Sequence, residues 1–440
     1  MTAPTLADLA GWLDATGEIG LPAGPGEVGP TDAERIDQIA LLERLKNALA
    51  GAQGRIAHDY EESQRAAQRA AGRPASRIGE GIAAAVALAR RVSPGVAATF
   101  LGLNRVLATE MPQTARALGE GRISEYAATL LARETACLAV EHRATIDEEI
   151  CGTDLADRLS RKQLVAEAHR LAARLDAAGV AERQALAVKD RRVTLRPAPD
   201  TMAYLTALVP VAEGVAMYAA LSREADRAKQ DPDDDRGRGQ VMADTMVELV
   251  TGRRAEAPPP VDLRLVMTDR ALLAGDSEPA FLHGYGIVPA AWARQLVKRA
   301  LGKTGVWITR LYTAPGTHQL LAADSRRRKA PPGLTDFVTD RDQLCRTPWC
   351  GAPVRHVDHV RPHRETGHTV ADDLQGLCER CNYAKEALGW SSRPRPGPVH
   401  GTETTTPTGH VYVSWAPPLP GGPGDPGDPG DPGGSDGRAA

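Results

Sequence analysis

The sequence predicts a mainly α-helical protein that ends in a small zinc-stabilised module. Aromatic residues make up only 4% of the 440 residues, and three of them are phenylalanines, a composition that favours closely packed helices over a sandwich or barrel. Apolar residues recur at spacings of three and four along most of the first 255 residues, as in amphipathic helices. Four of the six cysteines fall between residues 345 and 381, in two close pairs.

Composition and charge narrow the class of protein. The net charge of −3 gives no overall attraction to nucleic acid, so any such binding must come from local patches. The longest apolar run, Ile82–Ala89, is far too short to span a bilayer, and no secretory signal pattern is found near residue 1. Reduced thiols beside a metal-binding pattern fit the cytoplasm, so we expect a soluble cytoplasmic protein.

A long helix is predicted after a loose leader at residues 1–30. Thr31-Asp-Ala-Glu34 has the pattern of a capping box, which satisfies free backbone N–H groups of a first helical turn. The apolar stripe that follows serves either the core of the domain or a partner helix, and we expect the core. The second use would make the chain a homo-oligomer. The stripe consists of Ile36, Ile39, Leu42, Leu45, Leu49, Ala52, Ile56 and Tyr60.

The helical pattern continues to about residue 255. Ser160-Arg-Lys-Gln163 is a second capping box, and Cys137 and Cys151 have no cysteine neighbour at metal spacing, so we expect small buried hydrophobic residues there. Arg192–Arg196 predicts a short strand. Helices are expected over Met202–Ala225, with a break at Pro210, and from Gln240 to about Val250, where Gly252 closes the helix.

Beyond three consecutive prolines at 258–260 the pattern changes. Val261–Met267 alternates as a strand does, and residues 306–312 and 318–322 predict a hairpin. The chain ends in a Pro/Gly-rich stretch with three Gly-Asp-Pro copies, for which we expect a disordered tail. The predicted organisation is a leader at 1–30, a helical domain at 31–255, a connecting region at 256–334, the cysteine module at 335–395 and the tail at 396–440.

The cysteine spacing predicts a structural zinc site. Cys345 and Cys350 have four residues between them, Cys378 and Cys381 have two, and two tight turns of this kind supply four thiolates to tetrahedral Zn²⁺. The alternatives are a disulfide pair or unconnected thiols.

Polar side chains inside this frame point to chemistry. Asp358 and His359 lie between two valines on a predicted strand, so their side chains point to opposite faces and cannot both be buried core. Asn382 and Lys385 share one face of the helix that follows the last cysteines. A carboxylate and an amide oxygen suit Mg²⁺ or Mn²⁺, and a neutral histidine nearby suits a general base for water.

These residues resemble a known family. The order Cys-x4-Cys, Asp-His and Leu-x-x-Leu-Cys-x-x-Cys-Asn-x-x-Lys is similar to the HNH endonuclease module, or ββα-metal fold. The upstream chain resembles the helical domain of unknown function (number 222) that precedes HNH modules in actinobacterial proteins of the 13E12 repeat family. The resembling stretches are Leu41–Tyr60, Arg192–Ala212, Gln240–Gly252 and Gly284–Pro289.

The resemblance implies a role for each residue. His359 would be the general base that takes a proton from the attacking water, while Asp358 and Asn382 would bind the catalytic divalent ion. The four cysteines would bind structural zinc, and the substrate would be a phosphodiester bond of DNA. The family has an asparagine that fixes the loop beside the base where this chain has Asp373, which lacks amide donors. That departure bears on the loop geometry and hence on the rate.

Other residues have a weaker link to nucleic acid. Lys385 and His363 are candidates for phosphate contacts, as is the basic run with Arg326, Arg327 and Arg328, although such residues are also commonly just solvated. Each central residue also has a structural alternative: His359 as a surface or supporting imidazole, Asp358 as a turn cap, and Asn382 as a residue of a helix start.

Three functions therefore remain open from the sequence. The leading one is a metal-dependent HNH endonuclease associated with the nucleoid. The second is a zinc-stabilised DNA-binding or scaffolding protein whose nuclease chemistry has decayed. In the third, the helical region acts as an oligomerisation or partner-binding module.

Overall fold

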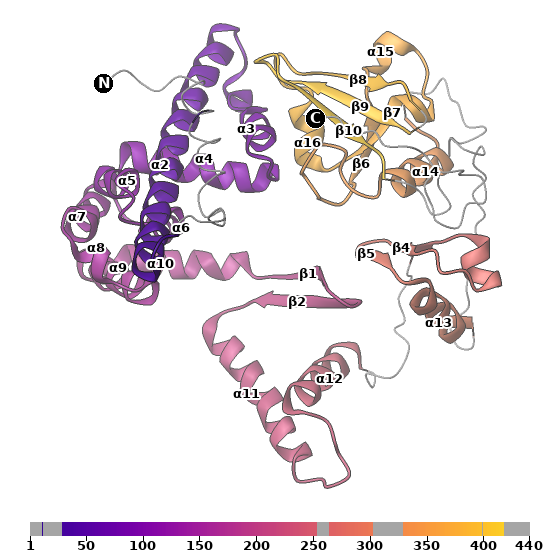
Figure 1. Cartoon of the computed structure of the whole chain (residues 1–440), viewed down its shortest axis with the longest axis horizontal. Coiled ribbons are helices and arrows are strands. Elements are labelled where there is room, and N and C mark those ends of the chain that lie inside the picture. The colour runs from indigo at the N-terminus through magenta and orange to yellow at the C-terminus, as the bar shows by residue number, and fades with distance from the viewer. Residues whose placement is uncertain (1–10, 12–28, 253–263, 302–328, 398, 418–440) are drawn as a thin grey trace. The chain divides into compact units, whose positions relative to one another are not determined.

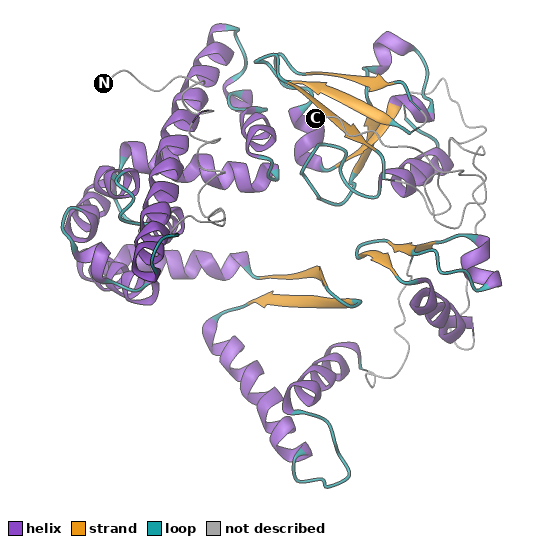
Figure 2. Cartoon of the chain, in the orientation of Figure 1, coloured by secondary structure: helices purple, strands orange, loops and turns teal. Residues whose placement is uncertain are grey.

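The computed structural model describes residues 29–252, 264–301, 329–397 and 399–417, together with Gly11 (Figure 1). Contacts divide the chain into two compact units, Met1–Ile56 with Leu103–Asp176, and Ala57–Gly102 with Ala177–Ala440. Helices dominate and the strands are few and short (Figure 2), so the predicted mainly α-helical class is confirmed. Within the described ranges, no helix combines the length and the apolarity needed to cross a membrane.

The first unit is built of helices. Its core contains Leu118, Leu131, Ile146, Ile150 and Leu171, all with less than 2% of their surface exposed. Helices α5 and α7 pack together, and α9 packs against both α6 and α7. The elements are the first part of α2 (Asp32–Ala70), the last part of α4 (Pro94–Thr109), α5 (Pro112–Gly119), α6 (Glu125–Glu134), α7 (Val140–Cys151), α8 (Leu155–Arg158) and α9 (Arg161–Leu175).

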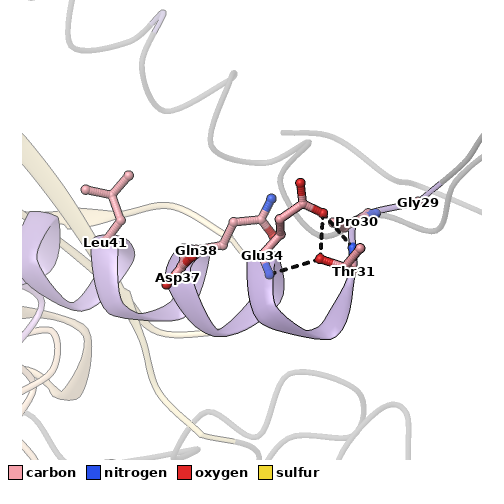
Figure 3. Close-up of a pocket in the computed structure, with 7 residues that line it drawn as sticks. All are labelled: Gly29, Pro30, Thr31, Glu34, Asp37, Gln38 and Leu41. Atoms are coloured by element: carbon pink, nitrogen blue, oxygen red, sulfur yellow. Dashed lines mark hydrogen bonds between the residues drawn. The ribbon is translucent and has the colours of Figure 1, made fainter.

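Both predicted capping boxes are present. The Thr31 backbone N–H donates to Glu34 Oε2 over 2.7 Å and the Glu34 N–H faces the Thr31 hydroxyl at 3.3 Å, as Figure 3 shows. Ser160 and Gln163 form the second box at the start of α9. Local side chains therefore satisfy the free N–H groups that begin these two helices.

The expectation that the apolar stripe of α2 is core is wrong over most of its length, although Tyr60 at its end packs against a buried cluster. Ile36, Ile39 and Leu49 are among the large apolar side chains of the helix that remain exposed. Small residues form the packed face instead: a Cβ added to Gly51 would lie 3.1 Å from the Gly119 nitrogen, and one on Gly54 would clash with a neighbouring amide. The buried face of α2 is therefore the face that neighbouring helices approach closely. The spacing of large apolar residues does not reveal which face this is.

The second unit begins with a helical part. α3 (Ile82–Arg90) and the start of α4 pack on the last part of α2 through Ala57, Val86 and Phe100. A short 3-10 turn, η1 (Ala75–Arg77), precedes them. The following elements are α10 (Ala177–Ala187), η2 (Val188–Asp190), β1 (Arg192–Ala198), β2 (Met202–Leu208), α11 (Val211–Ala228) and α12 (Arg238–Thr251).

One predicted helix is partly a strand. Residues 202–208 form β2 and pair antiparallel with β1, from Arg192 opposite Leu208 to Ala198 opposite Met202, so the prediction of a helix from Met202 is wrong over these residues. The sequence there is rich in Ala, Leu and Met, which favour helices locally, and pairing with β1 overrides that preference. The predicted strand at Arg192 and the helix end at Gly252, which has a φ of 68°, are confirmed.

A small sheet and a helix come next. β4 (Ala280–Leu282) is the central strand, between β3 (Leu265–Val266) and β5 (Gly286–Val288), and α13 (Ala290–Leu301) follows; η3 (Arg270–Ala274) is a short π-helical turn. The strand predicted over Val261–Met267 is observed only at Leu265–Val266, and residues 261–263 lie outside the described part. The hairpin predicted at 306–322 also lies outside it.

The last part of the chain contains the cysteine module. Helix α14 (Pro332–Asp342) contacts the antiparallel pair β6 (His356–His359) and β7 (Leu374–Leu377), and α16 (Glu379–Ala384) contacts β6. Two short turns, α15 (His363–Thr366) and η4 (Ala371–Asp373), lie between the strands. Leu334, Phe337, Val338 and Leu374 form the apolar core. The predicted strand–strand–helix module is therefore present.

A buried ion pair fixes the second strand of this module. Arg341 Nε lies 2.7 Å from the Asp342 carboxylate, and its guanidinium also donates to the carbonyls of Ala371 and Leu374. The same carboxylate accepts the Gly376 backbone N–H over 2.6 Å. Because every one of these partners is satisfied, the end of α14 sets the position of β7 and of the loop that precedes it.

The predicted disordered tail from 396 is wrong over residues 401–415. β8 (Ser391–Arg395), β9 (Gly401–Thr405) and β10 (Val411–Trp415) form an antiparallel sheet with β9 in the middle. The buried guanidinium of Arg346, the residue after Cys345, donates to the carbonyls of His400, Ser414 and Trp415. These hydrogen bonds connect the sheet to the cysteine module. Burial lowers the pKa of Arg346 to about 10. Residues 418–440 lie outside the described part.

Candidate functional site

The four cysteines form one cluster. Their Sγ atoms all lie within 4.8 Å of one another, and Cys350 Sγ lies 3.7 Å from the Sγ atoms of both Cys378 and Cys381. A tetrahedral site with Zn–S bonds of about 2.3 Å has S–S edges of about 3.8 Å. A disulfide needs an S–S distance of about 2.05 Å, so the four cysteines of the cluster are not joined by disulfides. The cluster can therefore hold a structural metal ion.

Hydrogen bonds among Cys345, Cys350 and Cys381 couple the acidities of these three thiols. Hydrogen bonds from Cys350 and Cys381 lower the pKa of Cys345, while the same contacts raise the pKa of Cys350 and Cys381. A bound divalent cation would favour the thiolate form of all four cysteines. Outside the cluster, burial raises the pKa of Cys151 to about 11, which agrees with a small buried hydrophobic role.

Local backbone geometry brings the cysteine pairs together. The Cys345 N–H donates to the Ala352 carbonyl over 2.8 Å, which folds the first pair into a tight turn with Trp349 and Gly351 at positive φ. Cys378 precedes α16, and Cys381 lies in its first turn and is buried.

Asp358 and His359 end strand β6. They lie opposite Gln375 and Leu374 of β7, so the pleat directs their side chains to opposite faces. The His359 ring is buried, whereas a third of the Asp358 side chain is exposed, at 36%. The expectation that the two are not both buried core agrees with this arrangement.

Lys385 lies against the Asp358 carboxylate. Its Nζ is 2.9 Å from Asp358 Oδ2 and donates to the His359 carbonyl over 2.8 Å, while the other carboxylate oxygen accepts the His359 N–H. Burial works against ionisation of Asp358, but the charge and hydrogen bond of Lys385 outweigh it and hold the pKa of the carboxyl below its usual value. Asp358 is therefore an anion at neutral pH.

The His359 ring is held at one nitrogen. Nε2 lies 2.9 Å from the Thr369 hydroxyl, which is fully buried, whereas Nδ1 is 3.9 Å from Asp358 Oδ1. Burial lowers the pKa of His359 below its ordinary 6.5, so the ring is neutral at neutral pH. A neutral imidazole is the form that can accept a proton.

Two further polar atoms near this strand pair are buried without a hydrogen-bond partner among the described residues, Asn382 Oδ1 and His363 Nε2. Asn382 lies on α16, which packs on β6, and the His363 ring centroid is 5.2 Å from that of His359. A buried amide oxygen with no partner is costly. It fits a position where a cation completes the coordination.

Asp373 is held by Arg361. Its Oδ1 accepts the Arg361 backbone N–H at 3.4 Å and Nε at 3.2 Å, and its own carbonyl accepts the Val360 N–H at 2.8 Å. The residue is buried, and Oδ2 has no hydrogen-bond partner in the described part of the chain. The ion pair of Arg361 and Asp373 thus holds the loop after β6 against the turn before β7.

The predicted residues of the module gather around β6. The structure places Asp358, His359, His363 and Lys385 in direct contact with another residue of the set, whereas the contacts of Asp373 are with Val360 and Arg361. Arg326, Arg327 and Arg328 lie outside the described residues. Sequence reasoning missed Arg361 and Thr369, because each acts through a contact across a loop. The only signal in the sequence for Arg361 was Asp373, because an aspartate in place of an asparagine calls for a basic neighbour.

Two family matches agree with this architecture. A domain of unknown function, DUF222, matches residues 36–342, and the HNH endonuclease family matches residues 345–388. No curated protein and no solved structure shows significant similarity to the chain. Because the first match spans more than half of the chain, the protein belongs to the DUF222 family, and it carries an HNH endonuclease module after that domain.

Proposed function

We propose that this protein is a divalent-metal-dependent endonuclease that hydrolyses phosphodiester bonds in DNA. The observation that carries the proposal is the pairing of a neutral, buried imidazole at His359 with an ionised carboxylate at Asp358, inside a module that matches the HNH family. An unprotonated base and an anionic metal ligand, here with Nδ1 and Oδ1 3.9 Å apart, are two groups that hydrolysis of a phosphodiester uses.

The residues that would hold the catalytic ion fit a hard cation. Asp358 offers a carboxylate, and Asn382 offers a buried amide oxygen that has no partner among the described residues. Bound Mg²⁺ or Mn²⁺ would stabilise negative charge on the scissile phosphate and on the leaving 3′ oxygen. The ammonium group of Lys385 pairs with the Asp358 carboxylate, so binding of the ion would require Lys385 to give up part of that contact.

His359 would perform the proton transfer. Nδ1 accepts a proton from water as the water oxygen attacks phosphorus, and the bond from phosphorus to the 3′ oxygen breaks. The leaving 3′ oxygen takes a proton from solvent, and the imidazolium returns its proton to solvent. His363 would donate to a phosphate oxygen, which is consistent with its buried Nε2 that lacks a partner in the described residues. We also propose contacts to the phosphates of nucleic acid from Lys385, Arg326, Arg327 and Arg328.

The four-thiolate cluster would bind zinc as a structural ion. Four sulfur ligands at tetrahedral spacing favour Zn²⁺ over Mg²⁺ or Mn²⁺, which prefer oxygen. Thiolate ligands need a reducing compartment, which supports a cytoplasmic location with nucleoid DNA as the substrate.

A second candidate is a DNA-binding or scaffolding protein whose nuclease chemistry has decayed, and Asp373 is the observation in its favour. Its carboxylate cannot donate hydrogen bonds as an asparagine amide would, and Oδ2 has no partner among the described residues. The hydrogen bonds that Arg361 donates to Asp373 argue against this candidate, because they hold the loop in place without the amide donors of an asparagine.

A self-association of the chain is a separate proposal. The exposed side chains of Ile36, Ile39 and Leu49 on α2 suit a second copy of the helix. Light scattering of the full chain tests it: a dimer that Ile39→Glu converts to monomer supports the proposal, and a monomeric wild type contradicts it.

Nicking of supercoiled plasmid with Mg²⁺ or Mn²⁺ separates the two main candidates. The endonuclease predicts relaxed product that disappears with a chelator. The decayed protein predicts a gel shift with no cleavage under any divalent ion, and no recovery of activity in Asp373→Asn.

A further inference from the structure

Thr369 is the side chain that holds the candidate base. It lies in the loop between α15 and η4, has none of its surface exposed, and places Oγ1 2.9 Å from His359 Nε2. His359 is itself buried, at 5% exposed, so no water from bulk solvent replaces this contact. The contact between the Thr369 hydroxyl and His359 Nε2 is therefore shielded from bulk solvent.

The contact decides which ring nitrogen is free. In a neutral imidazole one nitrogen carries the hydrogen and the other carries the lone pair, and the hydrogen bond at one nitrogen selects the tautomer. Nε2 is occupied by Thr369, and Nδ1 is the nitrogen on the side of the Asp358 carboxylate, 3.9 Å from Oδ1. If the hydroxyl donated to Nε2, the hydrogen would lie on Nδ1 and no proton could be accepted there.

We propose that the Thr369 hydroxyl accepts a hydrogen bond from Nε2–H of His359 and thereby keeps the lone pair on Nδ1, beside Asp358. The inference rests on the proposed function, in which His359 is the general base, and it makes Thr369 a positioning residue. Proton transfer adds a hydrogen to Nδ1 and leaves Nε2–H in place, so the same bond to Thr369 supports the ring before and after the transfer.

Substitutions separate the hydroxyl from the volume of the side chain. Thr369→Val keeps the shape and removes the acceptor, while Thr369→Ser keeps the acceptor and removes a methyl group. Loss of a hydrogen bond that orients a site residue typically reduces activity on the order of 10- to 100-fold. We expect a loss in kcat of that size for Thr369→Val with an unchanged KM, because the buried Thr369 does not reach the DNA.

Thr402 provides a matched control. It is also buried, at 2% exposed, and its hydroxyl has no hydrogen-bond partner among the described residues. Thr402→Val therefore makes the same chemical change in the same unit without touching His359. It should keep the wild-type kcat and spectrum.

The experiment uses the full chain labelled with ¹⁵N-histidine. Long-range ¹H–¹⁵N spectra at neutral pH report the tautomer of each ring, and the signals of His359 are those lost in His359→Gln. The wild type and Thr369→Ser should show Nε2 protonated, whereas Thr369→Val should show a mixture of tautomers. Plasmid cleavage with Mn²⁺ gives kcat for each variant, with recovery in Thr369→Ser.

The proposal is overturned by a His359 spectrum with Nδ1 protonated in the wild type, or by a Thr369→Val variant that matches the wild type in both tautomer and kcat. An equal loss of kcat in Thr369→Ser and Thr369→Val also contradicts it, since the hydroxyl would then be irrelevant. If no variant cleaves DNA, the proposed function fails, and the spectra still decide the role of Thr369.

Discussion

Nε of Arg361 lies 3.2 Å from Oδ1 of Asp373, and the Arg361 backbone N–H faces the same oxygen from 3.4 Å. Asp373 is buried, and the resemblance to HNH modules implies an asparagine at this position, so we propose that an ion pair replaces a neutral amide at the loop beside His359. Arg361 and Asp373 therefore hold this loop together as a pair.

Arg361→Met should destabilise the module, because it leaves a buried carboxylate without its cation. Arg361 is half exposed, so we expect a loss in the free energy of unfolding of about 1–2 kcal/mol, below that of a fully buried pair. Asp373→Asn should remove most of this cost when combined with Arg361→Met. Urea unfolding of the four proteins of the cycle measures the coupling, and strictly additive losses would show that the pair is not a unit.

Lys385→Gln tests whether Lys385 competes with the catalytic ion. Removing a positive charge 2.9 Å from the Asp358 carboxylate should tighten Mn²⁺ binding to the DNA-free protein, as measured by calorimetry. If Lys385 also contacts a phosphate, the variant should bind DNA with a salt slope smaller by about one. Weaker Mn²⁺ binding in the variant would mean that Lys385 supports the ion site instead of competing for it.

Cys378→Ser should release the structural metal and unfold the C-terminal module. Where four thiolates bind zinc in small folds, the ion contributes roughly 10–16 kcal/mol of folding free energy, so its loss should unfold the module. Metal content and circular dichroism measure the loss. Cys137→Ser, outside the cluster, is the control and should retain the metal. Unchanged metal content in Cys378→Ser would refute the four-thiolate assignment.

Acid should destabilise the sheet after the module through His400. Burial lowers the pKa of His400 to about 4 in the folded chain, while the unfolded value is near 6.5. The unfolded state therefore binds the proton first, so the stability that His400 contributes is complete above about pH 6.5 and is lost as pH falls toward 4. His400→Gln should flatten the pH dependence of the urea midpoint over that window. An unchanged slope would assign the effect to other groups.

The sequence predicts the module better than the domain that precedes it. Cysteine spacing and the Asp-His pair are local signals, and the structure places Cys345, Cys350, Cys378 and Cys381 in one cluster as expected. The contact between Thr369 and His359 depends on how the nine residues between them fold, which no sequence periodicity predicts.

The misses in the fold have the same origin. The strand at 202–208 forms because β1 pairs with it, and the tail at 401–415 is ordered because Arg346 binds its carbonyls. The buried face of α2 follows from the close approach at Gly51 and Gly54. In each case a partner distant in the sequence overrides a local preference.

The most direct test of the account compares plasmid cleavage by the wild type, His359→Ala and His356→Ala in Mn²⁺ and in Mg²⁺. His356 is an exposed residue of the same strand and serves as the matched control. The account predicts wild-type rates in His356→Ala and a loss of about 10²- to 10⁴-fold in His359→Ala, the usual contribution of a general base, with DNA binding retained. Equal cleavage by all three proteins, or cleavage by none of them with any divalent ion, would contradict the nuclease assignment.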